Sequence, residues 1–168
     1  YGVLRPGDTL VAATGRPYDT LEEVIGIRGE RGNGSLADLG VSYKQVDLKD
    51  NKVDYDALRA AIDPRVKAVE IQRSKGYAWR DSFSVDEIGE IISFVKSINK
   101  DIICIVDNCY GEFVDTKEPT EVGADLMVGS LIKNPGGGLA RSGGYIAGSA
   151  RCVELVSYRL TCPGIGRE

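Results

Sequence analysis

Short apolar runs alternate with helical patterns along most of the chain. The clearest amphipathic pattern follows Ser84, where apolar side chains recur three and four residues apart as far as Ile98. Ser84 and Glu87 have the spacing of a capping box, which predicts where this helix begins. The run from Ile102 to Val106 is apolar on both faces, which is typical of a central strand covered on both sides.

The same pattern predicts further elements before and after these two. Strands are expected at 8–13, 43–46, 66–71, 125–128 and 144–147. Helices are expected at 19–26, at 54–62, where Asp54 should be the N-cap, and at 150–158. In the first of these helices, Leu21, Val24 and Ile25 should form the buried face, and Asp19 or Thr20 should be the N-cap.

The alternation of strands and helices predicts an α/β fold. A mainly parallel sheet needs crossover helices, and these cover both of its faces. The expected architecture is therefore a three-layer α/β/α arrangement with a mainly parallel sheet.

Composition narrows the possible functions. The net charge of −4 gives no basic field that would favour nucleic acid or an anionic membrane, and no apolar run approaches membrane-spanning length. The chain contains no histidine, which excludes Ser-His-Asp and Cys-His catalysis and any His-ligated metal site. Four cysteines without paired C-x-x-C spacing favour a reduced, cytoplasmic protein, and we expect no metal site.

Two charged residues stand where parallel strands are expected to end. Asp107 follows the run from Ile102 to Val106, and Lys133 lies shortly after the strand expected at 125–128. Ligands of open parallel sheets bind outside the carboxyl ends of the strands, so both residues should face one crevice. A lysine there can hold pyridoxal phosphate as a Schiff base, and an aspartate can keep the ring nitrogen of the cofactor protonated. Each residue alone also fits a solvated surface or turn position; the pair favours the cofactor site.

An ion pair between Asp107 and the cofactor would be strong enough to keep the ring nitrogen protonated near neutral pH. An ion pair at roughly 4 Å with an effective dielectric of about 20 is worth ~4 kcal/mol. This corresponds to about three pKa units on the ring nitrogen before desolvation is subtracted. We also expect the crevice to lower the pKa of Lys133, because burial disfavours the charged amine. Ser130, three residues before Lys133, is a candidate donor to the cofactor phosphate.

Two motifs carry a resemblance to a known family. They are Asp-Asn-Cys-Tyr-Gly-Glu-Phe at 107–113 and Ser-Leu-Ile-Lys-Asn-Pro-Gly-Gly at 130–137, supported by 14–23, 34–36 and 71–80. With these motifs the sequence resembles fold-type I pyridoxal-phosphate enzymes. More narrowly, it is similar to the cystathionine β-lyase/methionine γ-lyase-like proteins known as aluminium resistance proteins. The resemblance extends over 1–168.

The resemblance implies roles for particular residues. Lys133 would be the Schiff-base lysine, Asp107 the partner of the pyridinium nitrogen and Ser130 a phosphate ligand. Tyr18 falls where relatives stack a tyrosine on the cofactor ring. Packing over the sheet edge is an equally good interpretation of Tyr18.

Further residues lie in the stretch 71–80. Gln72 and Ser74 fall near the position where relatives place an asparagine against the cofactor hydroxyl, and this chain has no asparagine there. Arg73, Lys75 and Arg80 are expected either to bind a substrate carboxylate or a neighbouring subunit, or to form a solvated basic loop.

The resemblance also implies an organisation and a reaction. Residues 1–168 would be the central part of the cofactor-binding large domain, with an N-terminal segment and a C-terminal small domain absent, and the parent would be a homo-oligomer, either dimer or tetramer. The expected reaction is cleavage of a carbon–sulfur bond in a sulfur amino acid by β- or γ-elimination. Two alternatives remain open: another fold-type I enzyme such as an aminotransferase or racemase, and a non-catalytic module that keeps the fold.

Overall fold

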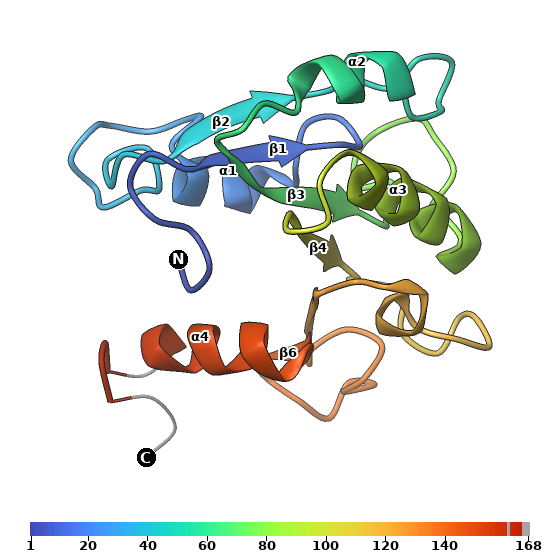
Figure 1. The fold of residues 1–168 in the computed structure, drawn as a ribbon. Helices are drawn as coiled ribbons and strands as arrows, with labels where there is room; N and C mark the ends of the chain where they lie inside the picture. The colour runs from blue at the N-terminus through green and yellow to red at the C-terminus, as the bar shows by residue number, and fades with distance from the viewer. Residues whose placement is uncertain (161, 166–168) are drawn as a thin grey trace.

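A six-stranded sheet in the order β2-β1-β3-β4-β5-β6 runs through the computed structural model, which describes residues 1–160 and 162–165 (Figure 1). The strands are β1 (Thr9–Ala12), β2 (Ser42–Gln45), β3 (Val66–Gln72), β4 (Ile103–Asp107), β5 (Leu126–Ser130) and β6 (Gly144–Gly148). The helices are α1 (Asp19–Ile25), α2 (Tyr55–Ala61), α3 (Val85–Ile98) and α4 (Ala150–Leu160), with a 3-10 helix, η1, at Pro119–Val122.

Strand pairing confirms the predicted α/β class. β1 pairs in parallel with β2 and β3, and β3, β4 and β5 continue the parallel pairing. Only the pairing of β5 with β6 is antiparallel among the described strands. All six predicted strands are present, with ends shifted by one or two residues at most.

Two apolar clusters, one on each face of the sheet, make up the core. The first contains Leu58 of α2 and Ile88 of α3, and the second contains Ile25 of α1 and Cys152 of α4. β4 contributes to both, because its alternate side chains point to opposite faces. Cys104 and Val106 lie in the first cluster, whereas Ile103 and Ile105 belong to the second. The predicted three-layer arrangement is therefore confirmed.

Two of the helix starts follow the predicted capping chemistry. The Ser84 side chain accepts from the backbone N–H of Glu87, and the Glu87 carboxylate accepts from the N–H of Ser84. Asp54 caps α2 by accepting from the N–H of Ala57 at 2.9 Å. These contacts satisfy backbone donors that have no partner inside the helix.

The prediction for α1 was wrong in two respects. Its N-cap is Tyr18, and no side-chain capping bond forms there within the described residues. Val24 is 41% exposed, whereas Glu22 is buried in its place. The reason is electrostatic: Arg16 and Arg28 both pair with the Glu22 carboxylate, so this charged side chain is tolerated on the inner face.

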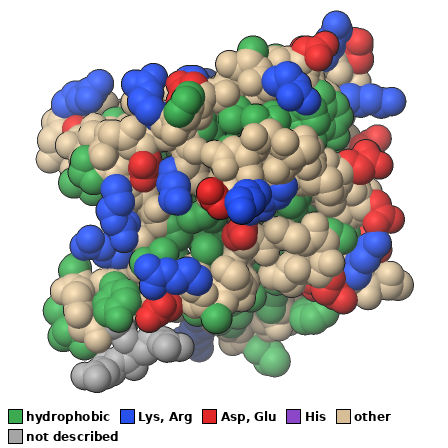
Figure 2. All heavy atoms as spheres, viewed as in Figure 1, with side chains coloured by type: hydrophobic (Ala, Val, Ile, Leu, Met, Phe, Trp, Pro, Cys, Tyr) green, Lys and Arg blue, Asp and Glu red, His purple; other side chains and the backbone are tan. Residues whose placement is uncertain are grey.

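The outer surface carries both signs of charge. Figure 2 shows Lys and Arg side chains interspersed with Asp and Glu over the visible face. Across the described ranges, 1–160 and 162–165, no helix combines the length and the apolar character needed to cross a membrane.

Candidate active site

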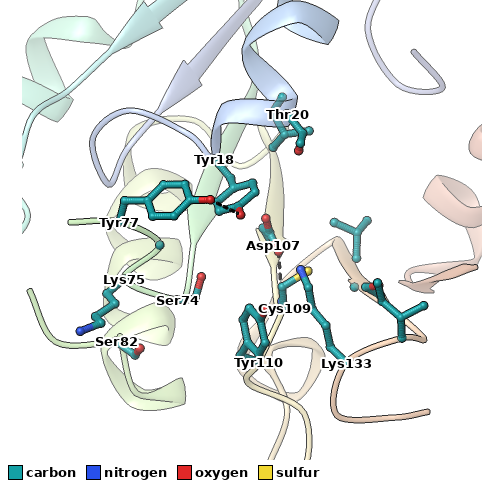
Figure 3. Close-up of a pocket in the computed structure, with 16 residues that line it drawn as sticks. Tyr18, Thr20, Ser74, Lys75, Tyr77, Ser82, Asp107, Cys109, Tyr110 and Lys133 are labelled. Atoms are coloured by element: carbon teal, nitrogen blue, oxygen red, sulfur yellow. Dashed lines mark hydrogen bonds between the residues drawn. The ribbon is translucent and has the colours of Figure 1, made fainter. Parts of the chain in front are cut away.

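The carboxyl ends of β4 and β5 form one wall of a cavity of about 770 Å³. Asp107 pairs in register with Val128, so the end of β4 lies directly beside β5. Ser130 ends β5, and Lys133 follows it by one turn. Asp107, Ser130 and Lys133 all line the cavity, as the strand ends predict. Figure 3 shows Asp107 and Lys133 at its border.

The amine of Lys133 lies among aromatic and thiol groups. Its Nζ is 4.7 Å from the ring centroid of Tyr110 and 5.9 Å from that of Tyr18. Burial lowers the pKa of Lys133, but hydrogen bonding to the Cys109 thiol and the nearby Tyr110 and Asp107 outweigh it, and the net pKa is raised. The expectation of a lowered pKa is therefore wrong, because acidic groups rather than cations surround the amine.

The carboxylate of Asp107 is anchored by the backbone that follows β4. Its Oδ1 accepts from the N–H of Cys109 at 3.0 Å, as the dashed line in Figure 3 marks. The neighbouring strand β3 places Gln72 in register with it. The side chain is partly buried, so one carboxylate oxygen is held by the turn while the group still borders the cavity.

Tyr18 lines the cavity together with a partner that the sequence did not indicate. The rings of Tyr18 and Tyr77 stack with centroids 5.3 Å apart, and their hydroxyls are 2.9 Å apart. This hydroxyl pair is the main cause that raises the pKa of Tyr18 to about 12. Tyr77 lies in the loop after β3, and its only signal in the sequence is the aromatic composition of that loop.

Of the two candidate cofactor ligands at the end of β3, Gln72 and Ser74, only one borders the cavity. Ser74 lines the cavity, but Gln72 is not among its lining residues. The Gln72 side chain is buried, donates from Nε2 to the Ser74 carbonyl at 3.0 Å, and borders a smaller hollow of about 240 Å³. Gln72 thus supports the backbone at Ser74, and its role as a direct cofactor ligand stays a prediction.

The basic residues of this loop do not behave alike. Arg73 is buried and donates to the Asn108 Oδ1 at 2.8 Å and the Gly111 carbonyl at 2.9 Å. Arg80 is buried and donates to backbone carbonyls, including that of Ser74 at 2.6 Å. The expectation that these two bind a substrate carboxylate or another subunit, or that they are solvated, is therefore wrong. Lys75 is exposed and lines the cavity.

A buried carboxyl group lies beside the site on the same face of β3. Glu70 is on the side of the sheet that carries Asp107, and neither of its carboxylate oxygens has a hydrogen-bond partner among the described residues. Burial is the main cause that raises the pKa of Glu70 to about 8, and Asp107 adds to it. The raised pKa favours the protonated, neutral form of Glu70 at neutral pH, so this group adds little negative charge next to Asp107.

The donor set determines which groups the site can hold. An amine, a carboxylate, hydroxyls and aromatic faces border the cavity, and this set fits a flat, anionic, aldehyde-bearing ligand. Within 1–160 and 162–165 no group of three or more His, Cys, Asp or Glu side chains is placed to hold a metal ion.

Comparison with known proteins places this geometry in a family. The methionine gamma-lyase family matches residues 1–168. The chain is 63% identical to the uncharacterized protein YnbB of Bacillus subtilis over 100% of its length and 40% of that protein. It is 57% identical to a structure from Listeria monocytogenes, named as a candidate cystathionine beta-lyase involved in aluminum resistance, with a TM-score of 0.95 over 99% of this chain and 41% of that one.

The name of a third relative states the class of bond that it cleaves. The carbon-sulfur lyase involved in aluminum resistance from Clostridium novyi is 55% identical, with a TM-score of 0.92 over 98% of this chain and 40% of that one. The chain thus spans about 40% of the length of these relatives. The matching fold and the match over 1–168 show that the chain belongs to the methionine gamma-lyase family.

Proposed function

We propose that the protein is a pyridoxal-phosphate-dependent lyase that cleaves a carbon–sulfur bond of a sulfur amino acid by β- or γ-elimination. One observation carries the proposal: Lys133 and Asp107 line a single cavity at the carboxyl ends of β5 and β4. The names of the relatives, which include a carbon-sulfur lyase, support the reaction class.

The residues of the cavity fit the proposed cofactor. Lys133 would hold it covalently through Nζ, Asp107 would face its ring nitrogen, and Ser130 would donate to its phosphate. Tyr18 presents an aromatic face to the cavity. The volume of about 770 Å³ lies within the range of about 300–1,000 Å³ that is typical of small-molecule sites.

Each residue then has a definite task. The bound cofactor supplies the electron sink for the bond cleavage. The Asp107 carboxylate would hold a proton on the ring nitrogen, since an ion pair at roughly 4 Å and an effective dielectric of about 20 is worth ~4 kcal/mol. Lys133 Nζ would be the base that takes the proton from the α-carbon of the substrate. The Tyr18 hydroxyl, whose pKa is about 12, keeps its proton at neutral pH and is a candidate donor to the departing sulfur.

The proposal includes a homo-oligomeric state, as dimer or tetramer, and a cytoplasmic location. Large apolar side chains near the cavity are exposed, including Tyr77 at 81% and Trp79 at 89%. Contiguous exposed apolar surface is a common mark of a protein interface, which supports the oligomer.

The test uses the protein at its full natural length. It is incubated with pyridoxal phosphate, reduced with borohydride and digested, and the modified peptide is located by mass spectrometry. The expected label is on Lys133, and Lys133→Ala should lose both the label and turnover. Label scattered over surface lysines would contradict the cofactor proposal.

A product assay distinguishes elimination from the reactions of other enzymes with this fold. Release of a keto acid together with a thiol is expected for elimination. Keto acid with an aminated cofactor would indicate a transaminase instead. Binding of the cofactor without turnover of any amino acid would favour a non-catalytic module.

A further inference from the structure

The segments that carry Asp107 and Lys133 are joined by a buried polar network that lies beyond the cavity wall. On one side, Arg73 holds the segment after β4 through the Asn108 side chain and the Gly111 carbonyl. Asn108 is fully buried and donates to Glu118 Oε2 at 2.9 Å. This side of the network fixes the turn that contains Cys109 and Tyr110.

On the other side, Glu112 links that turn to β6 and to the segment after β5. Its Oε1 accepts from the Tyr145 hydroxyl at 2.7 Å. Its backbone carbonyl accepts from Asn134 Nδ2 at 3.0 Å, and Asn134 directly follows Lys133. Glu112 is buried, and Tyr145 lies on the antiparallel strand next to β5. Glu112 therefore contacts both segments that border the cavity.

The backbone of β5 is shaped to admit this contact. A Cβ added to Gly129 would lie 2.4 Å from Glu112 Oε1 and 2.4 Å from Tyr145 Cε1. The absence of a side chain at this position of β5 leaves room for the carboxylate and the ring. Gly111 does the same on the Arg73 side, where a Cβ would lie 2.5 Å from the Arg73 Cδ.

We propose that Tyr145 and Asn134 are positioning residues that act through Glu112 and hold the Lys133 segment in register with the Asp107 segment. The inference rests on the proposed function, because holding the two segments in register would place Lys133 Nζ where it would hold the cofactor. Neither residue lines the cavity, so their effect on the reaction is indirect. A misplacement of a reacting group by about 1 Å can cost about 100-fold in rate, which leaves ample room for such an effect.

The main test is Tyr145→Phe in the full-length, cofactor-loaded protein. The variant keeps the ring and removes only the hydroxyl that donates to Glu112. We expect kcat per bound cofactor to fall by about tenfold while KM changes by less than about twofold, since substrate contacts are untouched. A merely structural role would lower the melting temperature without changing kcat per bound cofactor, and that result would overturn the proposal.

A second readout does not depend on activity. In the Tyr145→Phe variant, the rate of hydrogen–deuterium exchange should rise several-fold over the wild type in the peptides that contain 108–114 and 131–137. Tyr1→Phe is the matched control, because it removes a hydroxyl that donates to the Gly34 carbonyl at 2.8 Å and does not line the cavity. Unchanged exchange in 131–137 would overturn the proposal. If the wild-type protein neither binds pyridoxal phosphate nor turns over an amino acid, the proposed function fails. The exchange result then still decides whether Glu112 connects the Lys133 segment to the Asp107 segment.

Asn134→Asp is a second test of the proposal, for the case in which Tyr145→Phe misfolds. Asn134 is exposed, so its replacement disturbs no core packing, and aspartate removes the Nδ2 donor to the Glu112 carbonyl. The expected result is the same loss in kcat per bound cofactor and the same rise in exchange at 131–137. Wild-type values for both would contradict the role of Asn134.

Discussion

The carboxyl group of Glu70 makes the charge next to Asp107 depend on pH. The pKa of Glu70 is raised to about 8, first by burial and then by Asp107, while the Arg80 guanidinium opposes the shift. Burial raises the pKa of Tyr43 on β2, and the Glu70 charge adds to this shift. A neutral Glu70 adds no negative charge to its face of β3.

This charge state predicts how stability changes with pH. Because the folded-state pKa is raised, the folded protein binds the Glu70 proton between about pH 4.5 and 8, whereas the unfolded chain does not. Stability should therefore fall as pH rises through this window, by up to about 1.4 kcal/mol per pH unit from this group. Urea denaturation of wild type and Glu70→Gln at pH 5.5 and 7.5 measures it. Equal pH dependence in both proteins would contradict the assignment.

The raised pKa of Lys133 predicts how the protein takes up its proposed cofactor. Only the neutral amine attacks an aldehyde, so the rate of loading should rise about tenfold per pH unit below the pKa. Cys109→Ala removes a group that raises this pKa and should shift the rate profile to lower pH. Cys162→Ala, at an exposed position, is the control. Growth of the visible band gives the rates, and superimposable Cys109→Ala and wild-type profiles would refute the role of the thiol.

Residues at strand ends could be predicted from the sequence, and residues held by tertiary contacts could not. Asp107 and Lys133 were found because the apolar runs before them indicate where parallel strands end. Tyr77 reaches its position through the loop after β3, and Glu112 through packing against Gly129. Both lie in stretches that resemble the family, but no strand or helix period places their side chains. The resemblance to the family suggested Tyr18, and its geometry came from the structure.

At the scale of elements, predictability follows the chemistry of the helix ends. Ser84 and Asp54 mark their helices because a side-chain oxygen satisfies free backbone donors there. The helix pattern correctly gave Leu21 and Ile25 as facing the core. It missed Glu22, because the burial of this residue depends on arginines outside α1. The 3-10 helix at Pro119–Val122 has four residues, too few to show a period.

The cap of α3 predicts a measurable loss of stability. Ser84→Ala removes the oxygen that accepts from the Glu87 N–H and should cost about 1 kcal/mol. Ser97→Ala is the matched control, because that hydroxyl only donates back to the carbonyl of Phe94 within the helix. Chemical denaturation compares the two. An equal effect of both substitutions would show that the capping box adds no specific stabilisation.

At the scale of the whole molecule, apolar side chains gather beside the cavity on the outer surface. Tyr110 and Phe113 follow β4, and both are exposed on a turn where each has a positive φ. Non-glycine residues rarely adopt this conformation, and the network around Arg73 and Asn108 holds the turn in place. An apolar turn fixed in this way would present a defined surface to a second subunit of the proposed oligomer.

The proposed oligomer predicts a specific effect at this surface. Phe113→Ser should shift the full-length protein toward smaller species, because it removes exposed apolar area next to the cavity. Val24→Ser, on the outer face of α1, is a control of comparable chemistry. Sedimentation velocity over a range of concentrations gives the distribution. Identical distributions for both variants and the wild type would remove Phe113 from the interface.

The strand order also bears on how the chain folds during synthesis. β2 pairs with one edge of β1 and β3 with the other, and β4, β5 and β6 then follow outward in sequence order. Among the six described strands, each one after β1 pairs with an edge formed by strands that precede it in this order of synthesis, and none of the six inserts between two earlier ones of the six. Asp107 is added with the fourth strand and Lys133 after the fifth. Within these six strands, the two residues proposed to hold the cofactor therefore join the sheet only after its first three strands have paired.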